Sequence, residues 1–411
     1  MRKDWAECCF EDLLDYEQPT KYIVKSTKYN DSFKTPVLTA GKSFIKGYTN
    51  ETDGIFNNLP TIIFDDFTTA TQYVNFKFKV KSSAMKILVP TSKLVNMPFT
   101  YFAMQVNQVR SDTHKRYWIS VFAKKKFSLP PLVEQKAIVR KIEALFSSLD
   151  SGIADLKRAQ EQLKIYRQAV LKKAFEGELT KGVKPVISEL NEISSNIHYG
   201  YTASSSKEEI GPHMLRITDI QDNNVNWKTV PFCVIEKNKI NDYLLQKGDI
   251  LFARTGATVG KSYLIKNKIP ESVFASYLIR VQLKENILPE YIAYFFQSPK
   301  YWIQIGANSV GIGQPNVNGS KLKRLIIDYP KSKEEQHQIV QAIENRLSVC
   351  DKVEKDIADS LEKAQALRQS ILKKAFEGTL LSEEEIAKCK ADKEYEPASV
   401  LLERIKKEKN K

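Results

Sequence analysis

The sequence predicts an α+β protein built as a tandem repeat, in which two mixed α/β globular blocks alternate with two long helices. Three observations lead to this prediction. The stretch LKKAFEG occurs at 171–177 and again at 372–378, and around it residues 134–177 match 335–378 at 19 of 44 positions without a gap. Both copies carry apolar residues at helical spacing. The chain before each copy consists of short β-like runs broken by Gly, Asn and Pro.

Length and composition favour a folded, soluble protein. At about 150 residues per domain, 411 residues predict two or three domains, and 42% hydrophobic residues are enough to form their cores. The acidic start and the lack of any apolar run of about 18 residues argue against a signal peptide or a membrane span, so we expect a cytoplasmic protein. The five cysteines show no zinc-site spacing and are interpreted as reduced thiols: Cys8, Cys9, Cys233, Cys350 and Cys389.

The first globular block, residues 1–128, contains β-like runs such as VNFKFKVK, and the second, residues 181–328, contains GDILFAR and YLIRVQL. The blocks are predicted to be related by duplication, because IIFDD from Ile62 parallels ILFAR from Ile250. Four apolar residues of the first block also correspond to four of the second at a constant offset of 177: Phe10, Leu13, Tyr16 and Leu38 to Ile187, Leu190, Ile193 and Leu215.

The long helices are placed in residues 129–180 and 329–381. Apolar or small residues recur at steps of three or four in both copies, prolines precede each copy, and Gly177 and Gly378 suit helix C-caps. About 43 residues at 1.5 Å each give a rod of roughly 65 Å. A single rod would leave its stripe in water, so the two are predicted to pack as an antiparallel coiled coil. Residues 382–411 form a charged C-terminal tail with a short helix.

The net charge of +14 is concentrated in the globular blocks. Residues 1–133 hold 19 Lys and Arg against 12 Asp and Glu, and residues 178–334 hold 20 against 15. A basic surplus on folded domains indicates a polyanionic partner, bound through phosphate contacts that do not depend on base sequence. A merely soluble basic protein is the alternative on charge alone.

The motifs argue against catalysis. RTGATVGKS at 254–262 resembles a phosphate-binding loop, but Gly256 and Gly260 have three residues between them where four are required, and SYLIKNK after them is strand-like. The four histidines are scattered, and neither hydrolase motifs nor the tetrapeptide of an amino-methyltransferase are present. Asp65 and Asp66 could form a metal or general-base site, but a turn or a hydrogen bond from cytosine is favoured. We therefore predict no catalytic residue and no metal site.

Base-reading residues are expected in basic or amide-bearing, loop-like stretches of each block. Arg, Asn and Gln have the forked geometry that base edges require, whereas Lys more often holds phosphates. An ordinary exposed polar role is the alternative for each residue. The candidates are Thr39, Lys42, Lys46, His114, Lys115, Arg116 and Tyr117 in the first block, and Arg216, Thr218, Arg254, Lys261, Gln314, Asn316 and Asn318 in the second.

Over nearly its whole length the chain resembles the specificity subunit of type I restriction-modification systems. The doubled segments from EQ to LKKAFEG, KGDILFARTGATVGK, TAGKSFIKGYTN and the closing EYEPASVLLERIKKEK carry the resemblance. It implies two target-recognition domains, each reading one half of a bipartite, asymmetric site in double-stranded DNA. It also implies that the helices act as a ruler and dock two methyltransferase subunits, with restriction subunits joining the complex. S-adenosylmethionine, ATP and magnesium would then belong to those partners.

Two other functions remain open at this point. The chain could be the recognition subunit of a related restriction system in which nuclease and methyltransferase share one polypeptide. A coiled-coil scaffold that binds DNA without sequence preference is the alternative from a different class, and DNA affinity that depends on salt but not on sequence would identify it.

Overall fold

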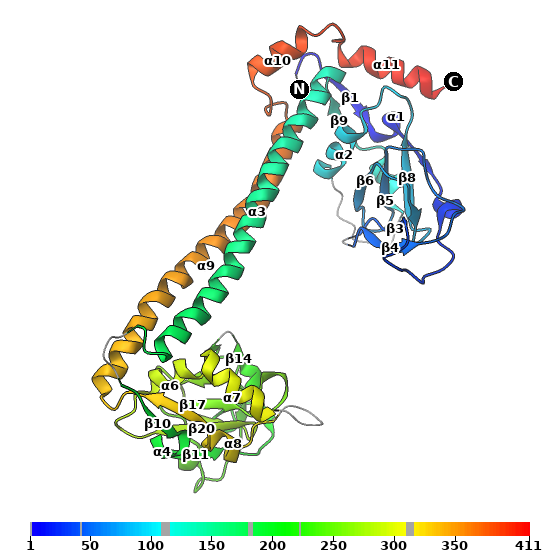
Figure 1. Cartoon of the computed structure of the whole chain (residues 1–411). Coiled ribbons are helices and arrows are strands. Elements are labelled where there is room, and N and C mark those ends of the chain that lie inside the picture. The colour runs from blue at the N-terminus through cyan, green and yellow to red at the C-terminus, as the bar shows by residue number, and fades with distance from the viewer. Residues whose placement is uncertain (1, 42, 108–115, 180–183, 222, 310–315) are drawn as a thin grey trace. The chain divides into compact units, whose positions relative to one another are not determined.

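The computed structural model describes residues 2–41, 43–107, 116–179, 184–221, 223–309 and 316–411. The chain divides into two compact units. Unit 1 consists of Met1–Leu156 with Asp359–Lys411, and unit 2 consists of Lys157–Ala358. Each unit therefore contains one globular block, part of the first long helix and part of the second (Figure 1).

Among the described residues, the globular block of unit 1 contains three sheets, two α-helices, a 3-10 helix at Pro19–Tyr22 and a π-helix at Trp118–Phe122. The sheet orders are β1-β9, β2-β8-β5-β6 and β4-β3-β7. The elements are β1 (Ala6–Cys9), α1 (Phe10–Leu13), β2 (Leu14–Glu17), β3 (Thr35–Leu38), β4 (Ile45–Thr49), β5 (Thr61–Asp65), β6 (Thr71–Val74), β7 (Lys79–Val80), β8 (Met85–Pro90), α2 (Met97–Val106) and β9 (Lys126–Leu129).

The globular block of unit 2 repeats this plan with additional elements. Its sheet orders are β10-β21, β11-β20-β17-β18, β12-β16-β13-β19 and β14-β15. The elements are β10 (Val186–Glu189), α4 (Leu190–Ile193), β11 (Ser194–Tyr199), β12 (Ser205–Ser206), β13 (His213–Leu215), β14 (Ile220–Gln221), β15 (Asn224–Val225), β16 (Phe232–Cys233), α5 (Ile240–Tyr243), β17 (Ile250–Ala253), β18 (Ser262–Leu264), β19 (Ser272–Phe274), β20 (Leu278–Leu283), α6 (Pro289–Phe295), α7 (Pro299–Ser309), α8 (Gly319–Lys323) and β21 (Ile326–Tyr329).

The shared topology supports the predicted duplication of the blocks. In both, a four-stranded antiparallel sheet is joined by a second sheet with one parallel pair, β3 with β7 and β13 with β19. Leu38 and Leu215 are equivalent, because their carbonyls accept from Lys81 and Ala275 at the same point of these pairs. The offset of 177 is wrong near the start of the blocks. There α1 begins at Phe10 and α4 at Leu190, so the offset is 180 and Phe10 does not correspond to Ile187.

The two long helices, α3 (Leu132–Phe175) and α9 (Lys333–Phe376), run side by side and antiparallel, as predicted (Figure 1). In unit 1 the core includes Ile142 of α3 and Leu372 of α9. In unit 2 it includes their repeat counterparts, Ile343 of α9 and Leu171 of α3. These core residues of the two helices are thus related by the repeat.

Both helices end as the sequence predicts. Gly177 has φ +82° and Gly378 has φ +76°, the left-handed conformation that glycine adopts without strain. The next residue in each case donates five residues back, Glu178 to the Lys173 carbonyl and Thr379 to the Lys374 carbonyl, both at 2.9 Å. This is the Schellman arrangement that satisfies the last carbonyls of a helix.

The apolar stripe is not buried along its whole length. Tyr166 is 48% exposed and Leu367 is 50% exposed, although both belong to the predicted stripe. A pair of helices covers only a narrow seam, so residues beside the seam remain in water unless a globular block packs on them. The globular blocks supply that cover only towards the helix ends.

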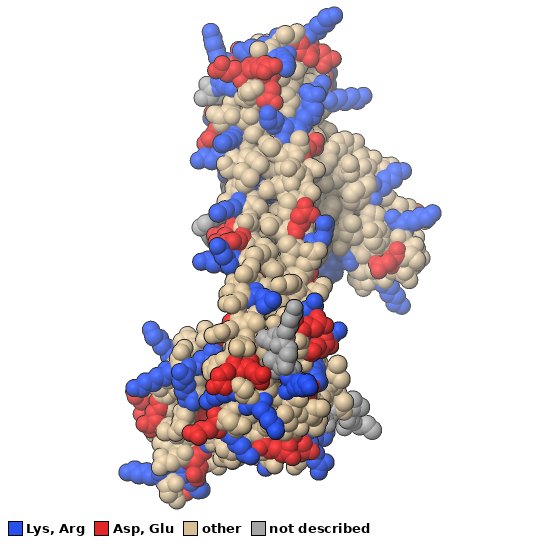
Figure 2. All heavy atoms as spheres, turned by 60° about the vertical axis from the view of Figure 1, so that its left-hand side comes forward, with Lys and Arg blue, Asp and Glu red and all other residues tan. Residues whose placement is uncertain are grey.

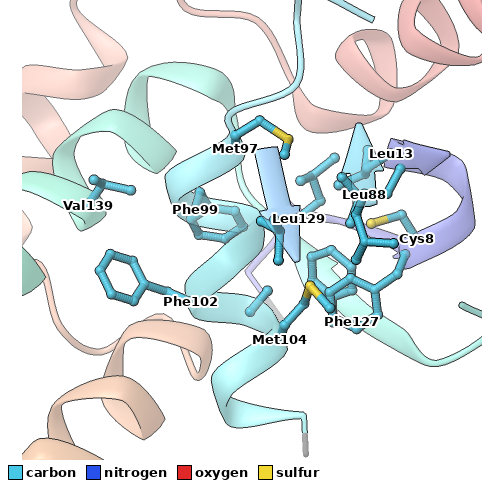
Figure 3. Close-up of a cluster of buried hydrophobic side chains, with 14 of the residues drawn as sticks. Cys8, Leu13, Leu88, Met97, Phe99, Phe102, Met104, Phe127, Leu129 and Val139 are labelled. Carbon is cyan, nitrogen blue, oxygen red and sulfur yellow. The ribbon is translucent and has the colours of Figure 1, made fainter. Parts of the chain in front are cut away.

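The C-terminal segment forms two helices, α10 (Glu383–Lys390) and α11 (Ala398–Lys409), that belong to unit 1. Leu401 and Ile405 of α11 enter the same core as Phe10. Figure 3 shows part of this core, where Phe102 of α2 and Val139 of α3 lie in one cluster. The charged tail is therefore a structural part of the first globular block.

Candidate nucleic-acid interface

The surface charge is mixed. Figure 2 shows one face of the chain, on which basic side chains are interspersed with acidic ones over both globular blocks. The basic surplus does not form an unbroken stripe on that face. Exposure and the presence of an existing partner therefore distinguish the candidate DNA contacts from one another.

In unit 1 the candidates differ in exposure. Lys46 on β4 and Arg116 are exposed. Thr39 follows β3, and its Oγ1 donates to the Ser43 carbonyl at 2.9 Å, within the β3–β4 connection. Lys42, His114 and Lys115 lie outside the described residues. Lys46 and Arg116 therefore remain the accessible basic candidates of this block.

Tyr117 has a packing role. Its side chain is only 7% exposed and belongs to the main core of unit 1, and its backbone N–H donates to the Asp66 carbonyl at 3.0 Å. A base contact needs an accessible side chain, so the structure gives no support to Tyr117 as a reader. The sequence THKRYW placed a buried aromatic directly beside the exposed Arg116.

Asp65 and Asp66 are used within the fold. Asp65 Oδ1 accepts from the backbone N–H groups of Phe67 and Thr68, which is the predicted turn. Asp66 is 2% exposed, accepts from the Trp118 N–H at 2.9 Å and lies 3.9 Å from the buried Lys86 ammonium. Neither carboxylate belongs to a group of three or more possible metal ligands, and the described residues contain no such group.

In unit 2 the arginine candidates Arg216 and Arg254 differ sharply. The Arg216 guanidinium donates to both carboxylate oxygens of Asp219, at 3.0 and 2.8 Å. By contrast, the Arg254 guanidinium forms no hydrogen bond or ion pair to any described residue, and its Nε is buried without a partner. A buried donor without a partner needs an explanation, and a ligand is one. Of the two candidate arginines, Arg254 is thus the one whose guanidinium has no hydrogen-bond partner among the described residues.

Arg254 stands at the meeting point of three segments. Its guanidinium lies over the ring of Tyr199, 4.9 Å from the centroid, at the end of β11. Its carbonyl accepts from the Val317 N–H at 3.0 Å, and the next residue, Thr255, forms a β-bridge with Asn316. The structure therefore brings two predicted readers, Arg254 and Asn316, to one place.

Three further candidates of unit 2, Asn318, Thr218 and Lys261, are exposed. Asn318 caps α8, because its Oδ1 accepts from the Lys321 N–H at 2.9 Å, so only its amide NH₂ is left for a ligand. Gln314 lies outside the described residues. Ser262 begins strand β18, which confirms that the glycine-bearing loop before it does not open a helix as a phosphate-binding loop would.

Sequence reasoning missed Tyr199 and Tyr277. Tyr199 is 39% exposed and Tyr277 is 61% exposed, and the Tyr277 carbonyl accepts from the Arg254 N–H. The available signal was an aromatic before a glycine in HYGY. A Cβ on Gly200 would lie 2.3 Å from the Ala275 carbonyl oxygen, so the end of β11 must pass very close to its neighbour.

A network of buried polar groups, centred on Arg280, lies beside the strand position of Tyr199. Arg280, 4% exposed, donates to the carbonyls of Asp242 and Leu244 at 2.7 Å and to His198 Nε2. Its Nη1 lies 3.5 Å from Asp249. Burial, together with the charge of Arg280, lowers the pKa of His198. A neutral His198 accepts from Arg280 and holds the strand position next to Tyr199.

No helix among the described residues has the length and apolarity needed to cross a bilayer.

Comparison with known proteins identifies the domains. The family model of the type I restriction modification DNA specificity domain matches residues 2–158 and again 181–363. Its two matches each contain one globular block and reach into one long helix.

Two relatives from Escherichia coli are similar in sequence. The EcoR124I/EcoR124II specificity subunit is 40% identical over 172 residues, which cover 39% of this chain and 43% of that protein. The EcoKI specificity subunit of strain K12 is 31% identical over 294 residues, covering 68% and 63%. The chain thus spans less than two thirds of the length of these relatives.

Two solved structures share the fold. One chain, from a study of complex assembly and conformational transition of the type I R-M system, superposes with a TM-score of 0.72 over 92% of this chain and 99% of its own length. The HsdS subunit from Thermoanaerobacter tengcongensis superposes with a TM-score of 0.57 over 92% and 98%. Both are 17% identical in sequence. Because two family-model matches together cover most of the chain and the fold agrees, the chain belongs to the type I restriction-modification DNA specificity family.

Proposed function

We propose that this chain is the sequence-specific DNA-binding subunit of a type I restriction-modification system. It recognises a bipartite, asymmetric site, one half through each globular block, and directs methyltransferase and restriction subunits to it. The sequence similarity to specificity subunits of type I restriction enzymes supports this proposal.

One difference between the two globular blocks supports the proposal that the two half-sites are unequal. Strands β5 and β17 are equivalent, so the residue after each occupies the same position in the duplicated fold. In unit 1 it is Asp66, buried and bonded to Trp118; in unit 2 it is Arg254, with unpaired donors. Asp66 is held in the core and is not available to a base, whereas Arg254 has the forked donor geometry that base edges require, so the two blocks differ at this position. The two blocks therefore read different half-sites.

The chain itself is proposed to be non-catalytic. Its near match to a phosphate-binding loop leads into a strand, and its paired aspartates serve the fold. S-adenosylmethionine, ATP and magnesium are assigned to two methyltransferase subunits and to the restriction subunits that join them. The long helices are the proposed docking and spacing element for those partners.

The test is a selection from a randomised double-stranded DNA library by the full chain purified with its methyltransferase subunits. The proposal expects a two-part motif with a degenerate gap and unequal halves. Selection of no motif, with affinity that depends only on salt, would identify a scaffold without sequence preference. A matched control is the methyltransferase alone, which should select no two-part motif.

A further inference from the structure

We propose that Tyr199 is the positioning residue of the second globular block, which fixes the reading side chains Arg254 and Asn316 relative to each other. The inference rests on the proposed DNA-binding function. It adds a specificity-determining residue that is neither basic nor an amide and that touches both reading segments at once.

The first contact of Tyr199 is with Arg254. The guanidinium lies over the ring at 4.9 Å from the centroid. An arginine stacked on an aromatic face keeps its N–H groups in the plane of the guanidinium, pointing away from the ring. This contact limits the rotamers of Arg254 without using its donors, which make no hydrogen bond to any described residue. The donors stay oriented and available.

The second contact of Tyr199 is with the segment that carries Asn316. The Tyr199 hydroxyl accepts from the backbone N–H of Gly319 at 2.7 Å. Gly319 is the first residue of α8, so this N–H has no partner within the helix. A Cβ on Gly319 would come within 3.2 Å of the Tyr199 hydroxyl oxygen, which shows how closely the segment is seated on the ring.

Together these contacts connect Tyr199 to both reading segments. Asn316 is bridged to Thr255, Thr255 follows Arg254, and Arg254 stacks on Tyr199, which holds Gly319. Removing the aromatic ring of Tyr199 breaks its contact with Arg254, and removing the hydroxyl breaks its hydrogen bond with Gly319. Base contacts require donors held in place, so breaking either contact should relax base preference more than total affinity.

The experiment uses the full chain with its methyltransferase subunits and a randomised double-stranded DNA library. Variants are Tyr199→Phe, which removes only the hydroxyl, Tyr199→Leu, which also removes the ring, and Arg254→Ala. Tyr201→Phe is the matched control, because the Tyr201 ring packs against the Tyr243 ring at 5.2 Å and its hydroxyl forms no hydrogen bond to Arg254 or Gly319. The unchanged half-site is an internal control for folding and assembly.

We expect Tyr199→Leu to reduce preference roughly tenfold at the base positions that Arg254→Ala also affects, in one half-site only. At those base positions, a variant that combines Tyr199→Leu with Arg254→Ala should lose no more base preference than Arg254→Ala alone, since Tyr199 acts there through Arg254. Tyr199→Phe should relax preference in the same half-site, while Tyr201→Phe should not.

Two results would overturn the inference. One is a wild-type motif for both Tyr199 variants, and the other is additive losses for Tyr199→Leu and Arg254→Ala. Loss of both half-sites in Tyr199→Leu with no change in Tyr199→Phe would assign the ring a purely structural role and would also overturn it. If the wild-type complex selects no motif at all, the proposed function fails, which is a distinct outcome.

Discussion

Arg167 on α3 and Asp351 on α9 form an ion pair in unit 2, with Arg167 Nη2 2.5 Å from Asp351 Oδ1. The residues 201 positions away from each, Arg368 and Asp150, form the corresponding pair in unit 1. The repeat is therefore preserved as a pair of reciprocal contacts. The repeated sequence thus forms two equivalent ion pairs between the antiparallel helices.

The first prediction concerns the ion pair between Arg167 and Asp351. Arg167→Leu should lower the free energy of unfolding by about 1 kcal/mol, because Arg167 also lies 2.8 Å from Glu354 and is only partly exposed. Urea denaturation of the full chain measures the change. Lys164→Leu is the control, because the Lys164 pair with Glu161 is much more exposed, and it should change stability by less than about 0.5 kcal/mol. Equal effects would mean that the reciprocal pair has no special role.

The second prediction concerns spacing. Residues 157–160 of α3 and 358–361 of α9 lie midway in sequence between the residues that form the ion pairs, Asp150 and Arg167 on α3 and Asp351 and Arg368 on α9. Deleting both segments removes about 6 Å of paired helix. If the helices act as a ruler, the gap between the half-sites should shorten by about two base pairs at 3.4 Å each. Methylation mapping reads both quantities, and altered half-site bases with an unchanged gap would refute the ruler.

The third prediction separates base reading from phosphate contact. Arg254→Ala should relax base preference in one half-site by roughly tenfold, since a forked donor is lost. Lys261→Ala should weaken binding to all sequences alike and reduce the slope of log affinity against log salt by about 1, because an exposed lysine holds a phosphate. Titrations with matched and single-base-changed duplexes at several salt concentrations distinguish the two. Identical behaviour of both variants would contradict the assignment of roles.

The fourth prediction concerns pH. The hydrogen bond from Lys141, followed by that from the Ser382 N–H, lowers the pKa of Glu385 from its ordinary value of 4.5 to about 2. The stability that Glu385 contributes is therefore fully present above about pH 4.5 and is lost as the pH falls through about 2. Glu385→Gln should flatten this part of the stability profile. Glu384→Gln is the control, because Glu384 is far more exposed, and an equal flattening there would exclude a specific role for Glu385.

Periodic features were predictable from the sequence, because they follow from local chemistry. Gly177 and Gly378 mark helix ends since few other residues adopt positive φ without strain. The three-residue error at Phe10 has an equally local cause. Ile187 precedes Leu190 by three residues, so apolar spacing alone allows either match, and only the fold shows that Ile187 is 68% exposed.

The candidate site was less predictable, because accessibility and pairing depend on contacts far apart in sequence. The pairing of Arg216 is an exception, because its partner Asp219 lies only three residues later and was visible in the sequence. The neighbours of Arg254, by contrast, are Tyr199 and Val317, which lie far from it along the chain. Tyr199 carries no charge or amide, so composition gave it no weight. Its role emerges only when β11 is seen beside the segment at Gly319.

The most direct test of the central claim is an exchange of residues 181–328 for the corresponding block of another family member, followed by base-resolved methylation mapping in a host with the partner subunits. One half of the bipartite motif should change, while the other half and the gap should be retained. A change in both halves, or in neither, would contradict the claim that each globular block reads its own half-site.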